Sequence, residues 1–304
     1  MTAPQNITPI PLVFSANDRY AELLGVALCS LWENKAADTQ LEIHVLDGGL
    51  STDSKRLLEI LEKKYNFNIN YLPIDLNLFA AYPEPDQDRL RLPTYSRLWA
   101  PQLIQRGKII YLDCDLVILK DLTPLFNEDL GDNIFGASAD SYEGYGAISL
   151  KNKSAFNAGV LVINCQLWRA RNLTAAATEF IQQNKDKITL YDQEALQFIG
   201  RDHYKILAQK YNRQLYEYSR RLRDDETFIM HYINKPNRFM DCGRNAYQYQ
   251  KYLEKTPWRN SRRPDKNLKN RFRKAIKIIL LRLGVLRPGR DWQSLKKFKI
   301  SKHA

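Results

Sequence analysis

Residues 108–119 read KIIYLDCDLVIL, an apolar run that two acidic residues interrupt. Residues 108–112 predict a buried strand, and Asp113, Cys114 and Asp115 follow where it ends. In open α/β sheets, ligands bind outside the carboxyl ends of the strands. Two carboxylates one residue apart at such a strand end can reach one ion, and hard oxygen ligands suit Mn²⁺ or Mg²⁺. The alternative is that Asp113 caps a turn and Asp115 is solvated.

Short apolar runs alternate with helical patterns on both sides of this stretch. The other predicted strands span residues 11–16, 41–46, 67–72, 134–139, 158–164 and 228–232. The predicted helices span residues 20–32, 94–104, 173–183 and 193–199, and a further helix opens at Ser51 or Thr52. Asp18 is the expected N-cap of the first helix. This order predicts an α/β domain with a mostly parallel sheet and right-handed crossovers.

The basic residues are unevenly distributed along the 304-residue chain. The net charge of +12 suggests a nucleic-acid-binding protein. However, residues 259–304 hold 16 of the 46 basic residues and only 2 of the 34 acidic ones. The first 258 residues therefore carry 30 basic and 32 acidic residues, a balance of −2. The charge predicts a nearly neutral domain over 1–258 that binds no nucleic acid, followed by a basic tail over 259–304.

The tail has its own pattern. Residues 259–270 are charged and contain proline, which is typical of a linker, and residues 271–286 can form a basic amphipathic helix. Such a helix, with Phe272 and the nearby Trp292, suits the surface of an anionic membrane. A nucleic-acid patch and a merely solvated tail are the alternatives.

Cysteine usage and hydropathy bear on the compartment. Cys29, Cys114, Cys165 and Cys242 are widely spaced without a CxxC pair, which favours free thiols in a reducing compartment. The first ten residues show no signal-peptide pattern, and no apolar run reaches the ~18–20 residues of a membrane span. We expect a cytoplasmic protein, peripheral on the inner face of the cell membrane through its tail.

Six motifs occur in a family-specific order. They are LVFSANDRY (12–20), HVLDGGL (44–50), TYSRL (94–98), YLDCDL (111–116), FNAGVLVIN (156–164) and YDQEAL (191–196). Over residues 12–258 the chain resembles glycosyltransferase family 8, the retaining GT-A enzymes that include glycogenin and bacterial lipopolysaccharide galactosyl- and glucosyltransferases. The resemblance implies a single GT-A (Rossmann-like) domain. It also implies transfer of galactose or glucose from a UDP-sugar.

The resemblance assigns the metal and nucleotide contacts. Asp113, Asp115 and His231 would hold Mn²⁺ or Mg²⁺, although a lone histidine is more often structural. The nucleotide-binding residues would be Ala16, Asn17, Tyr20, Asp113 and Cys114. Tyr20 would stack on the uracil base, with core packing as its alternative.

The resemblance also assigns the donor-sugar pocket. Arg97 would lie near the sugar and the first aspartate, with a surface salt bridge as its alternative. Asp140, Asn157, Asp192 and Gln193 would line the pocket, and turn or cap roles are their alternatives. Because a carboxamide is a poor nucleophile, we expect front-face attack, with Gln193 stabilising charge.

The sequence departs from the family pattern after His231. The segment 231–237 reads HYINKPN, which lacks the family's glycine and replaces its tryptophan after Lys-Pro. Lys235 would still reach the diphosphate, or it is a surface lysine. The acceptor is expected to be a cell-envelope glycan or a lipid-linked glycan. The departure keeps one alternative open, a nucleotide-sugar-binding protein of the same fold with weak or no activity.

Overall fold

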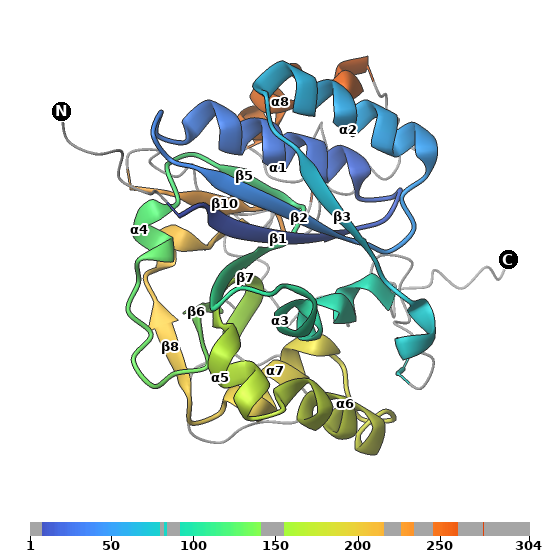
Figure 1. Cartoon of the computed structure of the whole chain (residues 1–304), viewed down its shortest axis with the longest axis vertical. Helices are drawn as coiled ribbons and strands as arrows, with labels where there is room; N and C mark the ends of the chain where they lie inside the picture. The colour runs from blue at the N-terminus through green and yellow to red at the C-terminus, as the bar shows by residue number, and fades with distance from the viewer. Residues whose placement is uncertain are drawn as a thin grey trace, which may run out of the picture.

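A computed structural model of the chain describes residues 8–79, 82–83, 92–140, 155–215, 226–233, 246–260 and 276. Its centre is a seven-stranded sheet of order β3-β2-β1-β4-β7-β6-β8 (Figure 1). These strands are β1 (Ile10–Ala16), β2 (Leu41–Asp47), β3 (Ile69–Pro73), β4 (Lys108–Leu112), β6 (Phe135–Ala139), β7 (Phe156–Asn164) and β8 (Tyr204–Leu207). Only β7 runs antiparallel to its neighbours, so the sheet is mostly parallel, as predicted.

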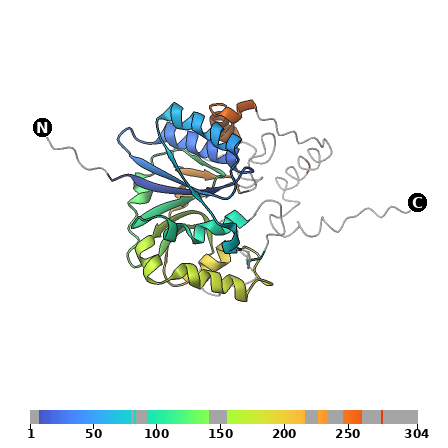
Figure 2. The same cartoon turned by 45° about the vertical axis from the view of Figure 1, so that its right-hand side comes forward.

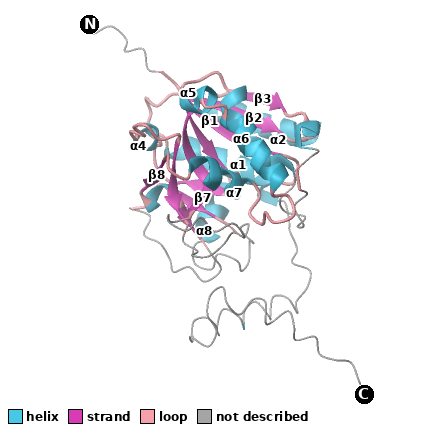
Figure 3. Ribbon diagram, turned by 90° about the horizontal axis from the view of Figure 1, so that it is seen from below, coloured by secondary structure: helices cyan, strands magenta, loops and turns pink. Residues whose placement is uncertain are grey.

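Helices and short 3-10 segments cover both faces of this sheet (Figures 2 and 3). One face carries α1 (Ala21–Asn34), α2 (Thr52–Tyr65) and α8 (Ala246–Leu253). The other carries the 3-10 segment η2 (Leu92–Leu98), α3 (Ala100–Leu103), α5 (Cys165–Ala170), α6 (Leu173–Gln183) and α7 (Asp192–Gly200). The remaining segments are η1 (Leu76–Phe79), α4 (Thr123–Phe126), η3 (Gln209–Tyr211) and η5 (Pro257–Asn260).

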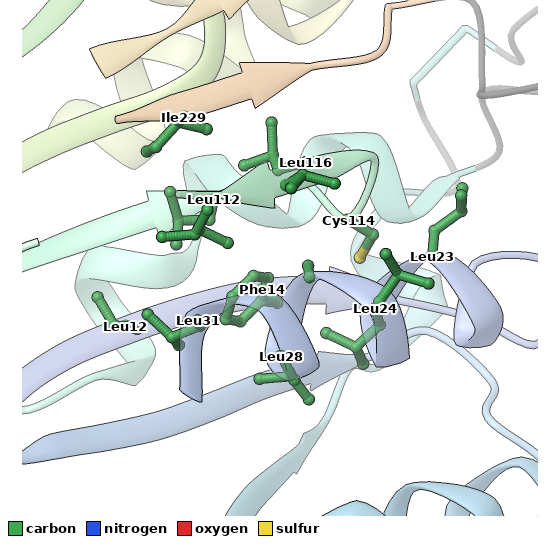
Figure 4. Packing of buried hydrophobic residues seen from close by; sticks show 14 of the residues in the cluster. Leu12, Phe14, Leu23, Leu24, Leu28, Leu31, Leu112, Cys114, Leu116 and Ile229 are labelled. Atoms are coloured by element: carbon green, nitrogen blue, oxygen red, sulfur yellow. The ribbon is translucent and has the colours of Figure 1, made fainter. Parts of the chain in front are cut away.

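The central strands are apolar on both faces because both faces are covered. Along β1, Leu12 and Phe14 pack in the core under α1, whereas Val13 points into the opposite core. In Figure 4, Phe14 and side chains of α1 such as Leu28 gather with Leu112 and Leu116. This packing fixes the carboxyl ends of β1 and β4, where the predicted site begins.

A second, three-stranded sheet lies beside the main one. It has the order β5-β10-β9 and comprises β5 (Leu116–Ile118), β10 (Ile229–His231) and β9 (Arg213–Gln214). Strand β10 pairs antiparallel with β5 and parallel with β9. This sheet joins segments more than 100 residues apart in the sequence.

Two local predictions were wrong. The helix predicted over 94–104 is instead η2 followed by the short α3, because Pro101 has no N–H for a continuing helix and is placed in the first turn of α3. Asp18 does not cap α1, whose N-cap position is held by Tyr20 without a side-chain capping hydrogen bond. The Asp18 carboxylate instead accepts a 2.7 Å hydrogen bond from the Ser51 N–H at the start of α2.

The described chain ends against α1. The Asn34 amide donates to the Tyr252 hydroxyl at 2.7 Å, and the Tyr249 hydroxyl donates to Glu22 at 3.0 Å. Trp258 lies so close to Gly25 that a Cβ there would be 2.4 Å from the indole ring. Beyond residue 260 the structure describes only residue 276, so the tail prediction lies outside the described residues.

Two compartment-related predictions can be compared with the described residues. Cys29, Cys114 and Cys165 are free and buried, as predicted, whereas Cys242 lies outside the described part. Among the described helices, none has the length and apolar character needed to span a bilayer.

Candidate functional site

The first aspartate is held against strand β7. Strands β4 and β7 pair antiparallel, and the Asp113 N–H donates to the Gly159 carbonyl at 2.8 Å. A Cβ at residue 159 would lie 2.9 Å from the Asp113 carboxylate and 2.2 Å from the His231 ring. Glycine is therefore required here for close approach, since any side chain would enter the space of these two groups.

Strand pairing brings His231 to the aspartates. His231 pairs with Leu116 in the β10–β5 ladder, and the Tyr232 N–H donates to the Asp115 carbonyl at 2.9 Å. His231 Nε2 lies 3.2 Å from Asp115 Oδ1 and 3.9 Å from Asp113 Oδ2. One ligand atom from each of the three residues falls within 4.8 Å of the others, the spacing of atoms that share one ion. The predicted metal triad is therefore assembled.

Arg97 is the cation built into the site. Its guanidinium bonds Asp113 Oδ1 and Asp192 Oδ2, each at 2.8 Å, and donates to the Ala158 carbonyl at 2.6 Å. It also stacks over Tyr111, with 4.8 Å between Cζ and the ring centroid. The side chain is buried, so the surface salt bridge considered for it is excluded. Burial opposes its charge, yet Asp113 and Asp192 raise the pKa of Arg97.

Within the site, carboxylates outnumber cationic side chains. Burial raises the pKa of Asp113, and the charge of Asp115 adds to this, while Arg97 and His231 oppose it. Burial also raises the pKa of Asp192, against the effect of Arg97. With a neutral His231, three carboxylates face one guanidinium, which leaves a local charge of −2. A divalent cation would neutralise this charge, and the donor set of carboxylate and imidazole fits Mn²⁺ or Mg²⁺.

The proton on His231 competes with a metal ion. Burial opposes the charged imidazolium, but the charge and hydrogen bond of Asp115, with the charge of Asp113, raise the pKa of His231. A metal ligand must be deprotonated, so a cation and the Nε2 proton exclude each other. The same two carboxylates would hold either one.

The predicted pocket residues surround strand β7. The Gln193 Oε1 accepts a 3.2 Å bond from the Ala158 N–H, and Asn157 Oδ1 accepts a 3.0 Å bond from the Gly159 N–H. Asp192 accepts from the Thr94 hydroxyl at 2.9 Å in addition to Arg97. It is thus part of the buried charge cluster.

Asp140 lies at the end of the neighbouring strand β6. Its N–H donates to the Ala155 carbonyl at 2.7 Å, and the residue is half-buried. Asp140 therefore shares the carboxyl-end edge of the sheet with the aspartates that follow β4.

The predicted nucleotide residues lie at the end of β1. Ala16 ends this strand, and the Tyr20 N–H donates to the Asn17 carbonyl at 2.9 Å in the turn that leads into α1. The Cys114 thiol donates to the Ser15 carbonyl at 3.1 Å, which joins the end of β1 to the segment with the two aspartates. Burial, then the charges of Asp115 and Asp113, raise the pKa of Tyr20.

Sequence reasoning missed two positions that contact the predicted site residues. Gly159 was read only as part of a family motif, and Asn212 lies in a segment without any recognised pattern. Asn212 is fully buried, and its side chain touches both His231 and Asn157 at 2.9 Å. Only the strand pairing of β9 with β10 reveals this contact. Lys235, the predicted diphosphate contact, lies outside the described part of the chain.

The comparisons with known proteins agree with this geometry. General stress protein A of Bacillus subtilis is 30% identical over 213 residues, 67% of this chain and 74% of that protein. Lipopolysaccharide 1,2-glucosyltransferase of Escherichia coli is 26% identical over 269 residues, 80% of this chain and 78% of that protein. Other curated relatives are longer, and this chain spans 62%, 48% and 55% of three of them.

A crystal structure of the galactosyltransferase LgtC, in complex with donor and acceptor sugar analogues, has the same fold. It superimposes with a TM-score of 0.72 at 28% identity and covers 83% of this chain and 100% of LgtC. The profile of Glycosyl transferase family 8 matches residues 11–237, which include every described site residue. The assembled triad, the fold and this match together show that the chain belongs to glycosyltransferase family 8.

Proposed function

We propose that this glycosyltransferase transfers galactose or glucose from a UDP-sugar to a glycan or lipid-linked acceptor of the cell envelope, with retention of anomeric configuration. The observation that carries the proposal is the cluster of the half-buried Asp113 and Asp115 with the buried His231. With Asp192 and Arg97, and with a neutral His231, the cluster has a charge of −2, which suits Mn²⁺. Bound there, a divalent ion supplies Lewis-acid stabilisation of the diphosphate as it leaves.

The residues of the chain would divide the other tasks. Arg97 would hold Asp113 in place through a charge-assisted bond to Oδ1. Tyr20 ends the turn that follows β1, and the charges of Asp115 and Asp113 act on its hydroxyl, which supports a role in which its ring covers the uracil base. The nucleotide would thus lie between the ends of β1 and β4.

Gln193 occupies the position that matches the candidate nucleophile of the family. Its carboxamide is neutral, and the Ala158 N–H fixes the Oε1 end of the group. Because such a group makes a poor nucleophile, we favour front-face attack, in which the acceptor hydroxyl approaches from the side of the leaving phosphate. An active-site Gln-to-Glu mutant of LgtC has been crystallised, which supports attention to a glutamine here. Anomeric analysis of the product tests this route, and an inverted product would refute it.

Release of UDP is the decisive measurement. We would incubate the full chain with UDP-galactose or UDP-glucose, with and without Mn²⁺, and compare wild type with Asp115→Ala. The matched control is Asp53→Ala, because Asp53 is exposed on α2 and far along the chain from the triad. Turnover that requires Mn²⁺ and disappears only in Asp115→Ala supports the proposal. Binding of UDP without any turnover would instead identify a nucleotide-sugar-binding protein.

The acceptor and the cellular location form a separate part of the proposal. Similarity to a lipopolysaccharide 1,2-glucosyltransferase supports a glycan acceptor made in lipopolysaccharide biosynthesis. The charge of residues 259–304 supports binding to the anionic inner face of the cell membrane. Flotation with anionic liposomes tests this by comparing the full chain with one that ends at residue 260. Equal flotation of both chains would refute the membrane role.

A further inference from the structure

Asn212 occupies a position that the proposed reaction does not yet explain. It follows η3 and precedes β9, whose parallel pairing aligns Gln214 with His231. Its side chain is fully buried and makes two contacts of 2.9 Å, from Oδ1 to His231 Nδ1 and from Nδ2 to Asn157 Oδ1. A buried amide with both ends engaged has one fixed orientation.

The orientation of these groups is set by a backbone donor. The Gly159 N–H can only donate, so the Asn157 atom that faces it at 3.0 Å must be the oxygen. The Asn212 atom that faces this oxygen must then be the amide nitrogen. The other end of Asn212 is therefore its oxygen, which can only accept, and the facing His231 Nδ1 must carry a proton.

This chain of bonds determines which nitrogen of His231 is free. With Nδ1 protonated, a neutral imidazole has its lone pair on Nε2, the atom that lies 3.2 Å from Asp115. Without these hydrogen bonds, a neutral ring would form its stronger hydrogen bond by carrying the proton on Nε2 and donating it to the Asp115 carboxylate. That tautomer has no lone pair for a cation in the triad.

We infer that Asn212 is a positioning residue that selects the metal-binding tautomer of His231, through the relay Gly159 N–H, Asn157 and Asn212. The inference rests on the proposed function, because it concerns the same metal site. The relay begins at the Gly159 N–H, and the carbonyl of the same residue accepts the Asp113 N–H. One residue of β7 thus orients two of the three metal ligands. Partners of this kind typically change metal affinity by ~10–100-fold.

The first test measures Mn²⁺ binding by electron paramagnetic resonance of the free ion, without any sugar donor. Asn212→Leu removes both bonds, and we expect its affinity for Mn²⁺ to fall by ~10–100-fold. Asn212→Asp keeps an acceptor for His231 Nδ1, and we expect it to bind at least ~10-fold more tightly than Asn212→Leu. Asn34→Leu is the matched control, since Asn34 is an amide with three hydrogen bonds at the opposite end of α1 from Tyr20.

The second test observes the tautomer directly in the metal-free protein. Nitrogen-15 spectra of the four histidines, recorded at a pH where the rings are neutral, distinguish Nδ1–H from Nε2–H. The His231→Gln variant assigns the signal of His231. We expect Nδ1–H in the wild type and in Asn212→Asp, and Nε2–H in Asn212→Leu. A reduction in stability alone would leave the tautomer unchanged, so this readout separates positioning from folding.

The two tests also separate this inference from the proposed function. An Nε2–H tautomer in the wild type, or wild-type Mn²⁺ affinity in Asn212→Leu, would overturn the role of Asn212 whether or not UDP-sugars turn over. If the wild type bound no Mn²⁺ yet showed the Nδ1–H tautomer, the relay would stand and the metal-dependent mechanism would fail.

Discussion

Two aspartates that follow consecutive strands of the chain, β4 and β5, have opposite surroundings. Asp121 follows β5 and is surrounded by donors: its Oδ1 accepts the Thr123 N–H at 2.8 Å, and its Oδ2 accepts the Ala36 N–H at 2.8 Å and the Thr39 hydroxyl at 2.7 Å. Burial opposes its ionisation, but these hydrogen bonds outweigh that effect and lower the pKa of Asp121. This carboxylate ties α1 and α4 to the end of β5.

Asp113 follows β4 and is surrounded mainly by other acceptors. Among the described residues its main donor is Arg97, which is shared with Asp192, with a further hydrogen bond from Tyr111, and Asp115 lies close by. Its pKa is raised by the loss of solvent and by the neighbouring negative charge. An aspartate that has its donors in the fold is structural, whereas one that lacks them is prepared for a cation.

The largest expected difference between the two aspartates comes from removing the charge of Asp113. Asp113→Asn should weaken Mn²⁺ binding by more than ~100-fold, since a lost ligand costs at least as much as a lost supporting residue. Its free energy of unfolding should stay the same or rise, because a buried carboxylate with a raised pKa destabilises the fold at neutral pH. Calorimetry with Mn²⁺ and thermal unfolding without it measure both quantities. A clearly lower melting temperature would contradict this view of Asp113.

The sequence allowed the residues near Asp113 to be predicted, because the signals are local. An apolar strand followed by Asp-x-Asp places two carboxylates at a strand end, and both were found there. The alternation of strands and helices likewise predicted the parallel part of the sheet. His231 required the family resemblance, since a single histidine after an apolar strand carries little information.

The relay to Asn212 could not be predicted from the sequence. It depends on the pairing of β9 with β10, and β9 has only two residues, too few for a periodic signal. Gly159 depends in the same way on the close approach of His231 and Asp113 across the fold. The helix predicted over 94–104 failed for a local reason, the proline at 101. Strands and helices could be predicted from the local sequence pattern, whereas contacts between segments far apart in the sequence could not.

The second expected effect comes from a comparison of two glycines, one at the site and one elsewhere in the fold. Gly159→Ala introduces a Cβ that would lie 2.2 Å from the His231 ring, so the ligand must move and Mn²⁺ affinity should fall by ~10–100-fold. Gly25→Ala is the matched control, because its Cβ would lie 2.4 Å from Trp258 instead. It should lower the melting temperature and leave Mn²⁺ affinity unchanged. Equal metal affinities in the two variants would contradict the role of Gly159.

The third expected effect is on stability alone. Asp121→Ala leaves the Ala36 and Thr123 N–H groups without their acceptor, and a lost acceptor of this kind costs roughly 1–3 kcal/mol in the free energy of unfolding. Metal affinity should not change, since β5 is still held by its ladder with β10. Urea unfolding and Mn²⁺ binding of the same preparation measure both. If Asp121→Ala lost metal affinity but kept its stability, Asp121 would belong to the metal site and would not be a structural residue.

The smallest expected effect is the dependence of this stabilisation on pH. The pKa of Asp121 is lowered in the folded protein, so its contribution is fully present above the unfolded value of about 3.9 and is lost as the pH falls through the lower folded value. Because the carboxylate is partly exposed, solvent screening should keep this contribution below about 1 kcal/mol.

The Asp121→Asn variant measures this contribution. Asn at this position cannot titrate, and it resembles the protonated acid in shape. The difference in unfolding free energy between wild type and Asp121→Asn should therefore be constant from pH 7 to about pH 5 and shrink below about pH 4. Urea unfolding across this range measures it, and a difference that grew on acidification would show that Asp121 is not stabilised as a carboxylate.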